Sequence, residues 1–107
     1  MAHPVLDPFQ VIADPSRRKM LQLLTTSSLT INSLAGNFEM SRPAVSKHVK
    51  ILEGAGFITI RDVGRERHCF LKQEGFHLLQ DWINFFDNFW MTRLSNLETI
   101  LTQKSTK

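Results

Sequence analysis

Residues 41–56 read SRPAVSKHVKILEGAG, and this stretch carries clear signals for the start and the end of one helix. Ser41 is a favoured capping residue, and Pro43 is tolerated in a first turn because the amides there have no helical partners. Gly54 and Gly56 are typical of a helix end. The polar residues between these signals are small hydroxyls and cations rather than Glu–Lys pairs, so the polar face is not typical of a solvated surface.

A helical wheel separates two faces of this segment. At 100° per residue, the apolar side chains of Val45, Val49 and Leu52 share one side. The opposite side is slim and cationic, and it consists of Arg42, Pro43, Ser46, Lys47 and Lys50. Such a face fits the major groove of DNA, where Lys and Arg reach phosphates or guanine edges. On this helix alone, a solvated amphipathic helix explains the pattern equally well.

Two residues of the same helix need separate treatment. The Ser41 hydroxyl and the first free amides can together hold a phosphate, so we include Ser41 among the DNA-binding residues. His48 resembles a base-contacting residue, but the wheel places it toward the apolar side. We therefore expect His48 to be partly packed and to form a local hydrogen bond rather than to contact DNA.

The flanking sequence favours nucleic-acid binding. Thr30 predicts the start of a short helix, TINSLAGNF, and a brief turn at Glu39–Met40 separates it from the helix at 41–53, which is typical of a helix-turn-helix motif. Two β-rich runs follow, FITIRDV and RERHCFLK, and Gly64 between them predicts a hairpin. Arg65 and Arg67 lie at its tip, where a wing would contact the flanking DNA backbone.

The rest of the chain predicts further helices. A short helix is expected at Pro8–Ala13, and Asp14–Pro15 is a strong start signal for another, SRRKMLQLLTTS. With 107 residues, the chain is long enough for a single domain. We expect a mainly α fold with a small β-hairpin (α+β), a winged helix-turn-helix with a long C-terminal dimerisation helix. The expected parts are dimerisation segments at 1–13 and 75–103, a helix-turn-helix at 30–53, a wing at 57–72 and a flexible tail at 104–107.

A long apolar helix is predicted from Phe76 to about Thr102, because this region contains neither Gly nor Pro. One stripe recurs every three or four residues, at Leu79, Ile83, Phe86, Trp90, Leu94, Leu97 and Leu101. A second stripe lies beside it, at Leu78, Trp82, Phe85 and Phe89. One stripe can cover the core of the domain, but two indicate an interface, so we expect a homodimer in which this helix packs against its mate. A wholly intramolecular core helix is the alternative.

Charge and composition narrow the class of protein. Residues 41–72 hold seven Lys/Arg against three acidic residues, whereas residues 73–103 hold one Arg against four acidic residues. This segregation indicates a basic working surface and a second region with a different task. There is no glycine-rich phosphate loop and no paired carboxylate constellation, so we expect no enzyme and no cofactor. No signal peptide or membrane span is recognisable, and we expect a soluble, cytoplasmic protein.

The sequence resembles the ArsR/SmtB family of bacterial winged-helix repressors over residues 5–103. The resemblance lies in IADPSRRKMLQLL and in SLAGNFEMSRPAVSKHVKILEGAGFITIRDVGRERHCFLK. The C-terminal FWMTRLSNLETIL looks most like the metal-free SdpR-type autorepressor branch. The resemblance implies a homodimer built from the first and last helices, and repression of its own or a neighbouring operon. It also implies operator binding through the helix at 41–53, with base-facing positions at Arg42, Pro43, Ser46 and Lys47.

The chain departs from the family pattern at positions where some members bind the metal that they sense. Metal sensors of the family carry a Cys-x-Cys pair on the helix before the recognition helix, where this chain has TINSLAG. Others carry paired ligands on the last helix, where only His77 and Asp81 could serve, and two ligands do not close a tetrahedral site. We therefore expect no metal. The functional alternatives are a winged-helix protein-interaction module and a ligand- or thiol-responsive repressor that uses Cys69, although a lone cysteine in an apolar strand is usually packed.

Overall fold

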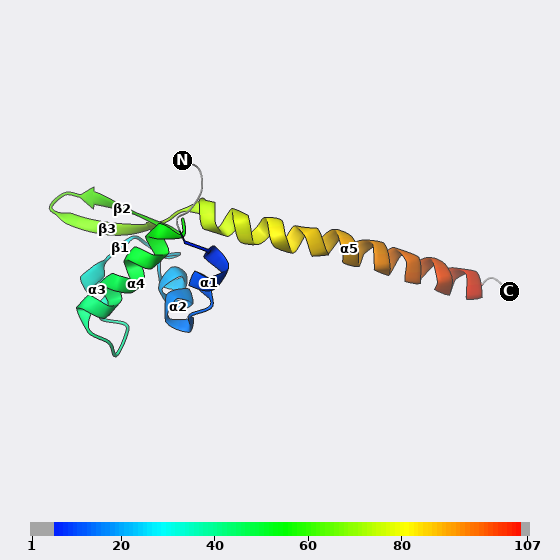
Figure 1. The fold of residues 1–107 in the computed structure, drawn as a ribbon, viewed down its shortest axis with the longest axis horizontal. Coiled ribbons are helices and arrows are strands. Elements are labelled where there is room, and N and C mark those ends of the chain that lie inside the picture. Colours follow the sequence, from blue (N-terminus) through cyan, green and yellow to red (C-terminus); the bar gives the residue numbers. More distant parts are fainter. Residues whose placement is uncertain (1–5, 106–107) are drawn as a thin grey trace.

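The computed structural model describes the backbone of residues 6–105 and the side chains of residues 6–102. Residues 1–5 of the expected dimerisation segment and residues 106–107 of the expected tail lie outside the described residues. The elements in chain order are α1 Pro8–Ile12, α2 Pro15–Leu23, β1 Leu29–Thr30, α3 Ile31–Ala35, α4 Arg42–Gly54, β2 Ile58–Val63, β3 Glu66–Leu71 and α5 Gln73–Ser105. Helices α1–α4 and the sheet form a compact head from which α5 projects as a long arm (Figure 1). The predicted fold class, a winged helix-turn-helix with a long C-terminal helix, is confirmed.

The short helices begin at the predicted caps. Asp14 Oδ1 accepts hydrogen bonds from the amides of Ser16 and Arg17 at 2.8 and 3.2 Å, and Pro15 occupies the first position of α2. The hydroxyl oxygens of Thr30 and Ser41 accept from amides three residues later, at 3.1 and 3.3 Å. Each cap satisfies one or two amides that a helix start leaves unpaired.

Helix α3 is shorter than predicted. It ends at Ala35 rather than continuing through TINSLAGNF, so the turn to α4 spans residues 36–41 instead of Glu39–Met40 alone. Gly36 is a poor helix former, and after it the amides of Asn37 and Phe38 bond only three residues back, to Leu34 and Ala35. The Lys19 ammonium lies over the Phe38 ring, 5.0 Å from its centroid, and so holds this turn against α2.

The predicted hairpin belongs to a larger sheet. Strands β2 and β3 pair antiparallel with Val63 opposite Glu66, so the turn has two residues, and Gly64 adopts a φ of 64° that an L side chain rarely takes. The sequence did not predict β1, which pairs with β3 through Leu29 opposite Cys69 and gives the strand order β1-β3-β2. The wing is therefore fastened at its base to the segment that precedes α3.

The core of the head lies between the helices and the sheet. Val45, Val49 and Leu52, the predicted apolar side of α4, are at most 1% exposed. They pack with Met20, Leu34 and Phe57, which are fully buried. Because the inner side of α4 is buried completely, its opposite side must face solvent, and this orientation positions the candidate site.

Helix α5 begins at Gln73, three residues before the predicted start, and continues to Ser105. Its first turn touches the head so closely that a Cβ on Gly75 would lie 2.8 Å from the Ala55 carbonyl oxygen. Phe76 packs edge-on against Phe57 with ring centroids 4.9 Å apart. The arm is thus anchored in the core at one end, although the glycine that permits this contact obscured the start of the helix in the sequence.

Candidate nucleic-acid interface

The outer face of α4 presents the residues that the wheel selected. Arg42, Pro43, Lys47 and Lys50 are exposed, and Ser46 is half-buried. The Arg42 Nε donates a hydrogen bond to Asn32 Oδ1 on α3, so its guanidinium is held near the turn between the two helices. The exposed cations give this face a positive charge, and the small side chain of Ser46 keeps it slim.

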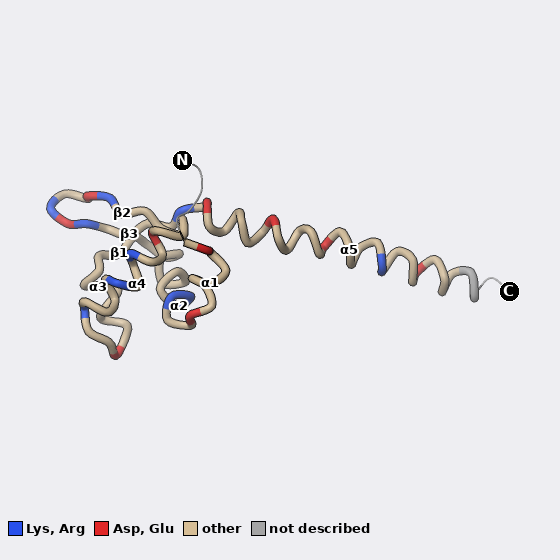
Figure 2. Tube along the Cα trace, viewed as in Figure 1, with Lys and Arg blue, Asp and Glu red and all other residues tan. Residues whose placement is uncertain are grey.

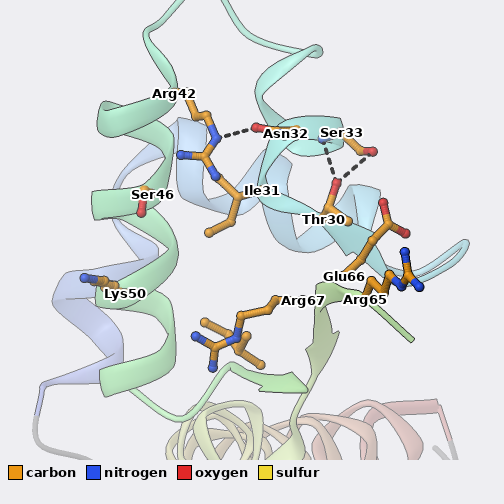
Figure 3. Close-up of a pocket in the computed structure, with 11 residues that line it drawn as sticks. Thr30, Ile31, Asn32, Ser33, Arg42, Ser46, Lys50, Arg65, Glu66 and Arg67 are labelled. Atoms are coloured by element: carbon orange, nitrogen blue, oxygen red, sulfur yellow. Dashed lines mark hydrogen bonds between the residues drawn. The ribbon is translucent and has the colours of Figure 1, made fainter. Parts of the chain in front are cut away.

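A hollow of about 620 Å³ lies between α3, α4 and the sheet. Figure 3 shows Arg42 extending from α4 toward Asn32, while Arg67 enters the same space from the hairpin. The predicted DNA-binding residues that line the hollow are Arg42, Ser46, Lys50, Arg65 and Arg67. A second hollow of about 370 Å³ lies on the other flank of α4, where Pro43, Lys47 and Leu6 are among the lining residues. The outer face of α4 is therefore a ridge between two depressions.

The wing contributes cations whose partners differ. Arg67 Nε lies 3.4 Å from the Asp62 carboxylate, and both side chains are about three-quarters exposed, so this ion pair contributes little stability. The Arg61 guanidinium stacks over the Phe70 ring at 4.0 Å from its centroid. Arg65 occupies the tip beside Gly64 and is exposed. Figure 2 shows most Lys and Arg on the head and the hairpin, where Asp and Glu also lie, and acidic residues spaced along α5.

The predicted interface did not include Thr30, Asn32 and Ser33, yet all three line the larger hollow beside Arg42. The wheel of α3 contained the signal, because Leu34 is its buried position and Asn32 and Ser33 are exposed. Glu66 also lines the hollow and is the one acidic residue among its lining. Its carboxylate lies 3.3 Å from His68 Nε2.

Ser41 and His48 differ in part from the expectations. The Ser41 oxygen caps α4, and Pro43 has no amide hydrogen, so fewer free amides remain for a phosphate than the sequence suggested. His48 is half-buried as expected, but its hydrogen bond is not local: its Nδ1 accepts from Arg17 Nε on α2 at 3.1 Å. Partial burial alone would raise the pKa of the nearby Asp14 carboxyl, but the Arg17 and Ser16 amides and the charges of Arg17 and His48 together lower it.

The residues of the first apolar stripe of α5, which form the proposed dimer seam, are mostly exposed in a single chain. Leu79 is half-buried against the head, whereas the other six are between 38% and 58% exposed: Ile83, Phe86, Trp90, Leu94, Leu97 and Leu101. Near the head, Trp82 of the second stripe meets Phe9 of α1 edge-on, with ring centroids 5.5 Å apart. Helices α1 and α5 thus form one continuous apolar surface.

The candidate sensing residues are divided between β3 and α5. Cys69 is fully buried in β3, and burial together with the nearby Glu53 charge raises the pKa of its thiol. His77 and Asp81 are both exposed on the first turns of α5. Within residues 6–105, no group of three or more His, Cys, Asp or Glu side chains could hold a metal ion. None of the helices in the same described range combines the length and apolarity that a bilayer-spanning helix requires.

A helix-turn-helix followed by a hairpin wing, with cations along the groove between them, defines the class of winged helix-turn-helix proteins. Residues 14–59, from α2 to the start of β2, match the family of bacterial regulatory proteins described as the arsR family. The transcriptional repressor SdpR of Bacillus subtilis is 37% identical over 76% of this chain and 87% of its own length. The HTH-type transcriptional regulator Rv2034 of Mycobacterium tuberculosis is 31% identical over 87% of this chain and 84% of its own.

A solved structure agrees with these relatives. It is described as a possible transcriptional regulator for arsenical resistance, and it is 42% identical with a TM-score of 0.68 over 87% of this chain and 94% of that one. The chain belongs to the arsR family of bacterial regulatory proteins. It is accordingly a transcriptional regulator with a helix-turn-helix domain, and not an enzyme.

Proposed function

We propose that the protein is a homodimeric repressor that binds operator DNA at its own or a neighbouring operon. Helix α4 enters the major groove through Arg42, Pro43, Ser46 and Lys47, and the wing contacts flanking backbone through Arg65 and Arg67. Such a repressor acts in the bacterial cytoplasm and is nucleoid-associated while it is bound. The observation that carries the proposal is the exposed cationic ridge of α4, whose opposite side is buried in the core.

The hollow beside α4 supports separate roles for two sets of residues, one contacting phosphates and the other contacting bases. A helix in the major groove and a wing over the adjacent groove leave one strand of backbone between them, and the larger hollow lies in that position. Lys50 and Arg67 line it from opposite sides, so both can approach the phosphates of that strand. Base discrimination then depends on Arg42 and Lys47 near the start of α4, where side chains reach base edges.

The dimer is supported by the arm. Apolar side chains on α5 that are about half exposed, such as Ile83, Trp90 and Leu94, favour burial against an identical helix. A second copy supplies a matching surface of the same shape, as a two-fold interface requires. Two α4 helices would then face successive major-groove segments about one turn, ~10 bp, apart.

The test removes two cations from the ridge. A target duplex is first selected from random-sequence DNA with the wild-type protein, and its affinity is then measured for Arg42→Ala/Lys47→Ala. Each specific base contact contributes roughly 1–3 kcal/mol, so we expect affinity to fall at least about 30-fold while sedimentation still shows a dimer. Wild-type affinity should also fall steeply with added salt, because phosphate contacts release counterions.

A matched control is Arg18→Ala/Lys72→Ala, which removes the same charge from two exposed positions, one in α2 and one directly after β3. This variant should lose only the general electrostatic attraction and should keep its preference for the selected duplex over random DNA. If Arg42→Ala/Lys47→Ala binds the selected duplex as tightly as the wild type, the DNA proposal is wrong. The protein-interaction alternative would then become the leading one.

A further inference from the structure

The segment Asp14–Arg18 helps to place the chain in its family, but the proposed DNA interface uses none of its side chains. We propose that Arg17 is a positioning residue that fastens the recognition helix α4 to helix α1, so that dimer formation sets the separation of the two recognition helices. This inference rests on the proposed function, because it concerns how the same dimer meets two half-sites.

A single half-buried side chain connects three helices. Arg17 belongs to α2, its Nη1 donates to the Val11 carbonyl oxygen of α1 at 3.0 Å, and its Nε donates to His48 Nδ1 of α4 at 3.1 Å. Asp14 accepts from the Arg17 amide and places a carboxylate near the guanidinium. A guanidinium presents its donors in a rigid fork, so both bonds constrain the same plane.

The connection joins a helix of the proposed dimer surface, α1, to the proposed DNA-binding helix, α4. At one end, α1 packs against the arm through Phe9 and Trp82, and α1 and α5 carry the proposed dimer surface. At the other end, His48 is the neighbour of Lys47, which lies on the outer face of α4. Because His48 is held from the inside, the rotation of α4 about its axis is fixed relative to α1. Arg17 therefore transmits the geometry of the dimer surface to the DNA-contacting face.

The bond also restricts which side chain can replace its acceptor. Arg17 Nε carries a hydrogen, so the atom opposite it at His48 Nδ1 must offer a lone pair. An amide oxygen at the position of Nδ1 would accept the same hydrogen bond, whereas an apolar side chain would not. This difference gives a pair of substitutions at one site that separate the hydrogen bond from mere packing.

The expected consequence is specific to DNA with two half-sites. A dimer whose recognition helices are held at one separation binds half-sites about 34 Å apart and rejects other spacings. When the connection is lost, each α4 can still bind one half-site, but the pair no longer prefers one spacing. Affinity for a single half-site and for random DNA should therefore change only as the loss of one positive charge requires.

The experiment compares Arg17→Met with the charge-matched control Arg18→Met. Arg18 also donates to the end of α1, to the Ile12 and Ala13 carbonyls at 2.9 and 3.0 Å, but from an exposed position of α2. Each variant is titrated with the duplex selected by the wild type, with single half-sites, and with duplexes whose half-sites are moved by one or two base pairs. Arg17→Met should lose about 10-fold in affinity for the selected spacing and most of its discrimination between spacings. Arg18→Met should retain that discrimination.

Substitutions at His48 guard against a folding defect in Arg17→Met. His48→Asn should preserve the spacing preference, His48→Leu should abolish it, and Arg17→Met/His48→Leu should be no worse than either single variant, since both remove one interaction. Wild-type discrimination in His48→Leu, or in a folded Arg17→Met, would overturn the inference. Its failure is distinct from failure of the proposed function, which Arg42→Ala/Lys47→Ala reports independently.

Discussion

The head and the arm contain similar apolar side chains but bury them to very different degrees. In the head, Phe57, Met20 and Leu34 are fully buried, whereas Trp82, Phe85 and Trp90 of the arm are 56–70% exposed. The arm has 33 residues, a length of about 50 Å at 1.5 Å per residue. The radius of gyration is 20.0 Å, against roughly 13 Å for a compact domain of this size. The head is stabilised by its own core, whereas the apolar side chains of the arm would be buried by the proposed dimer.

The contrast shows what apolar periodicity alone can and cannot establish. In α4 the stripe of Val45, Val49 and Leu52 meets other elements of the same chain. In α5 a stripe with the same spacing extends beyond the head and meets solvent in the single chain (Figure 1). Periodicity identifies the face that will be buried, but the position of the helix in the fold determines whether the same chain buries it.

The largest expected effect comes from a charge on the arm. Phe86→Glu or Trp90→Glu would place two carboxylates in each dimer interface, so sedimentation should show monomers at concentrations where the wild type is dimeric. Affinity for the selected duplex should fall greatly, because each monomer holds only one half-site. Met91→Glu is the control, since Met91 is 66% exposed and lies on the polar side of the helix with Gln80 and Glu98. An intact dimer in Trp90→Glu would refute the proposed seam.

A cavity in the head should act on stability rather than on assembly. Phe57 is fully buried and packs against Phe76 at the base of the arm, so Phe57→Ala should lower the free energy of unfolding by about 3–5 kcal/mol. Chemical denaturation measures the change. Val63→Ala is a suitable comparison, because Val63 is 46% exposed in the hairpin and its loss should lower stability by less than about 1 kcal/mol. Equal effects of the two substitutions would contradict the assignment of the core.

The smallest effect concerns the cap of α2. Asp14→Ala should lower stability by about 1 kcal/mol at neutral pH, since it removes the acceptor for the Ser16 and Arg17 amides. The pKa of Asp14 is lowered in the folded chain, so its contribution is present above about pH 4 and is lost as pH falls through the lower folded pKa. Denaturation midpoints of wild type and variant should converge below pH 4. Glu39→Ala, at an exposed position, should show no such convergence.

The strongest sequence signals predicted most of the fold. The caps at Asp14, Thr30 and Ser41, the buried side of α4 and the glycine turn of the hairpin are local features, and each forms as the sequence indicates. The elements that were missed depend on contacts between distant segments. Strand β1 has two residues and exists because Leu29 meets Cys69, forty positions away. No local pattern identifies such a strand.

The candidate site could be predicted to a similar extent. The wheel of α4 identified its exposed cations, because a single buried face determines the opposite one. It did not identify Asn32 as the acceptor for Arg42, or Arg17 as the partner of His48, which lies 31 positions away. These contacts arise when α2, α3 and α4 pack together, and their spacing along the chain carries no signal.

The buried thiol of Cys69 can report how often the sheet opens. It is the one thiol in the sequence, and in the sheet it stands between Leu29 and Ile60 with no exposed surface. An alkylating reagent can reach it only when the base of the wing opens, so the alkylation rate measures the free energy of that opening. Comparison of the rate in free and DNA-bound protein would show how firmly the nucleic acid holds the sheet closed.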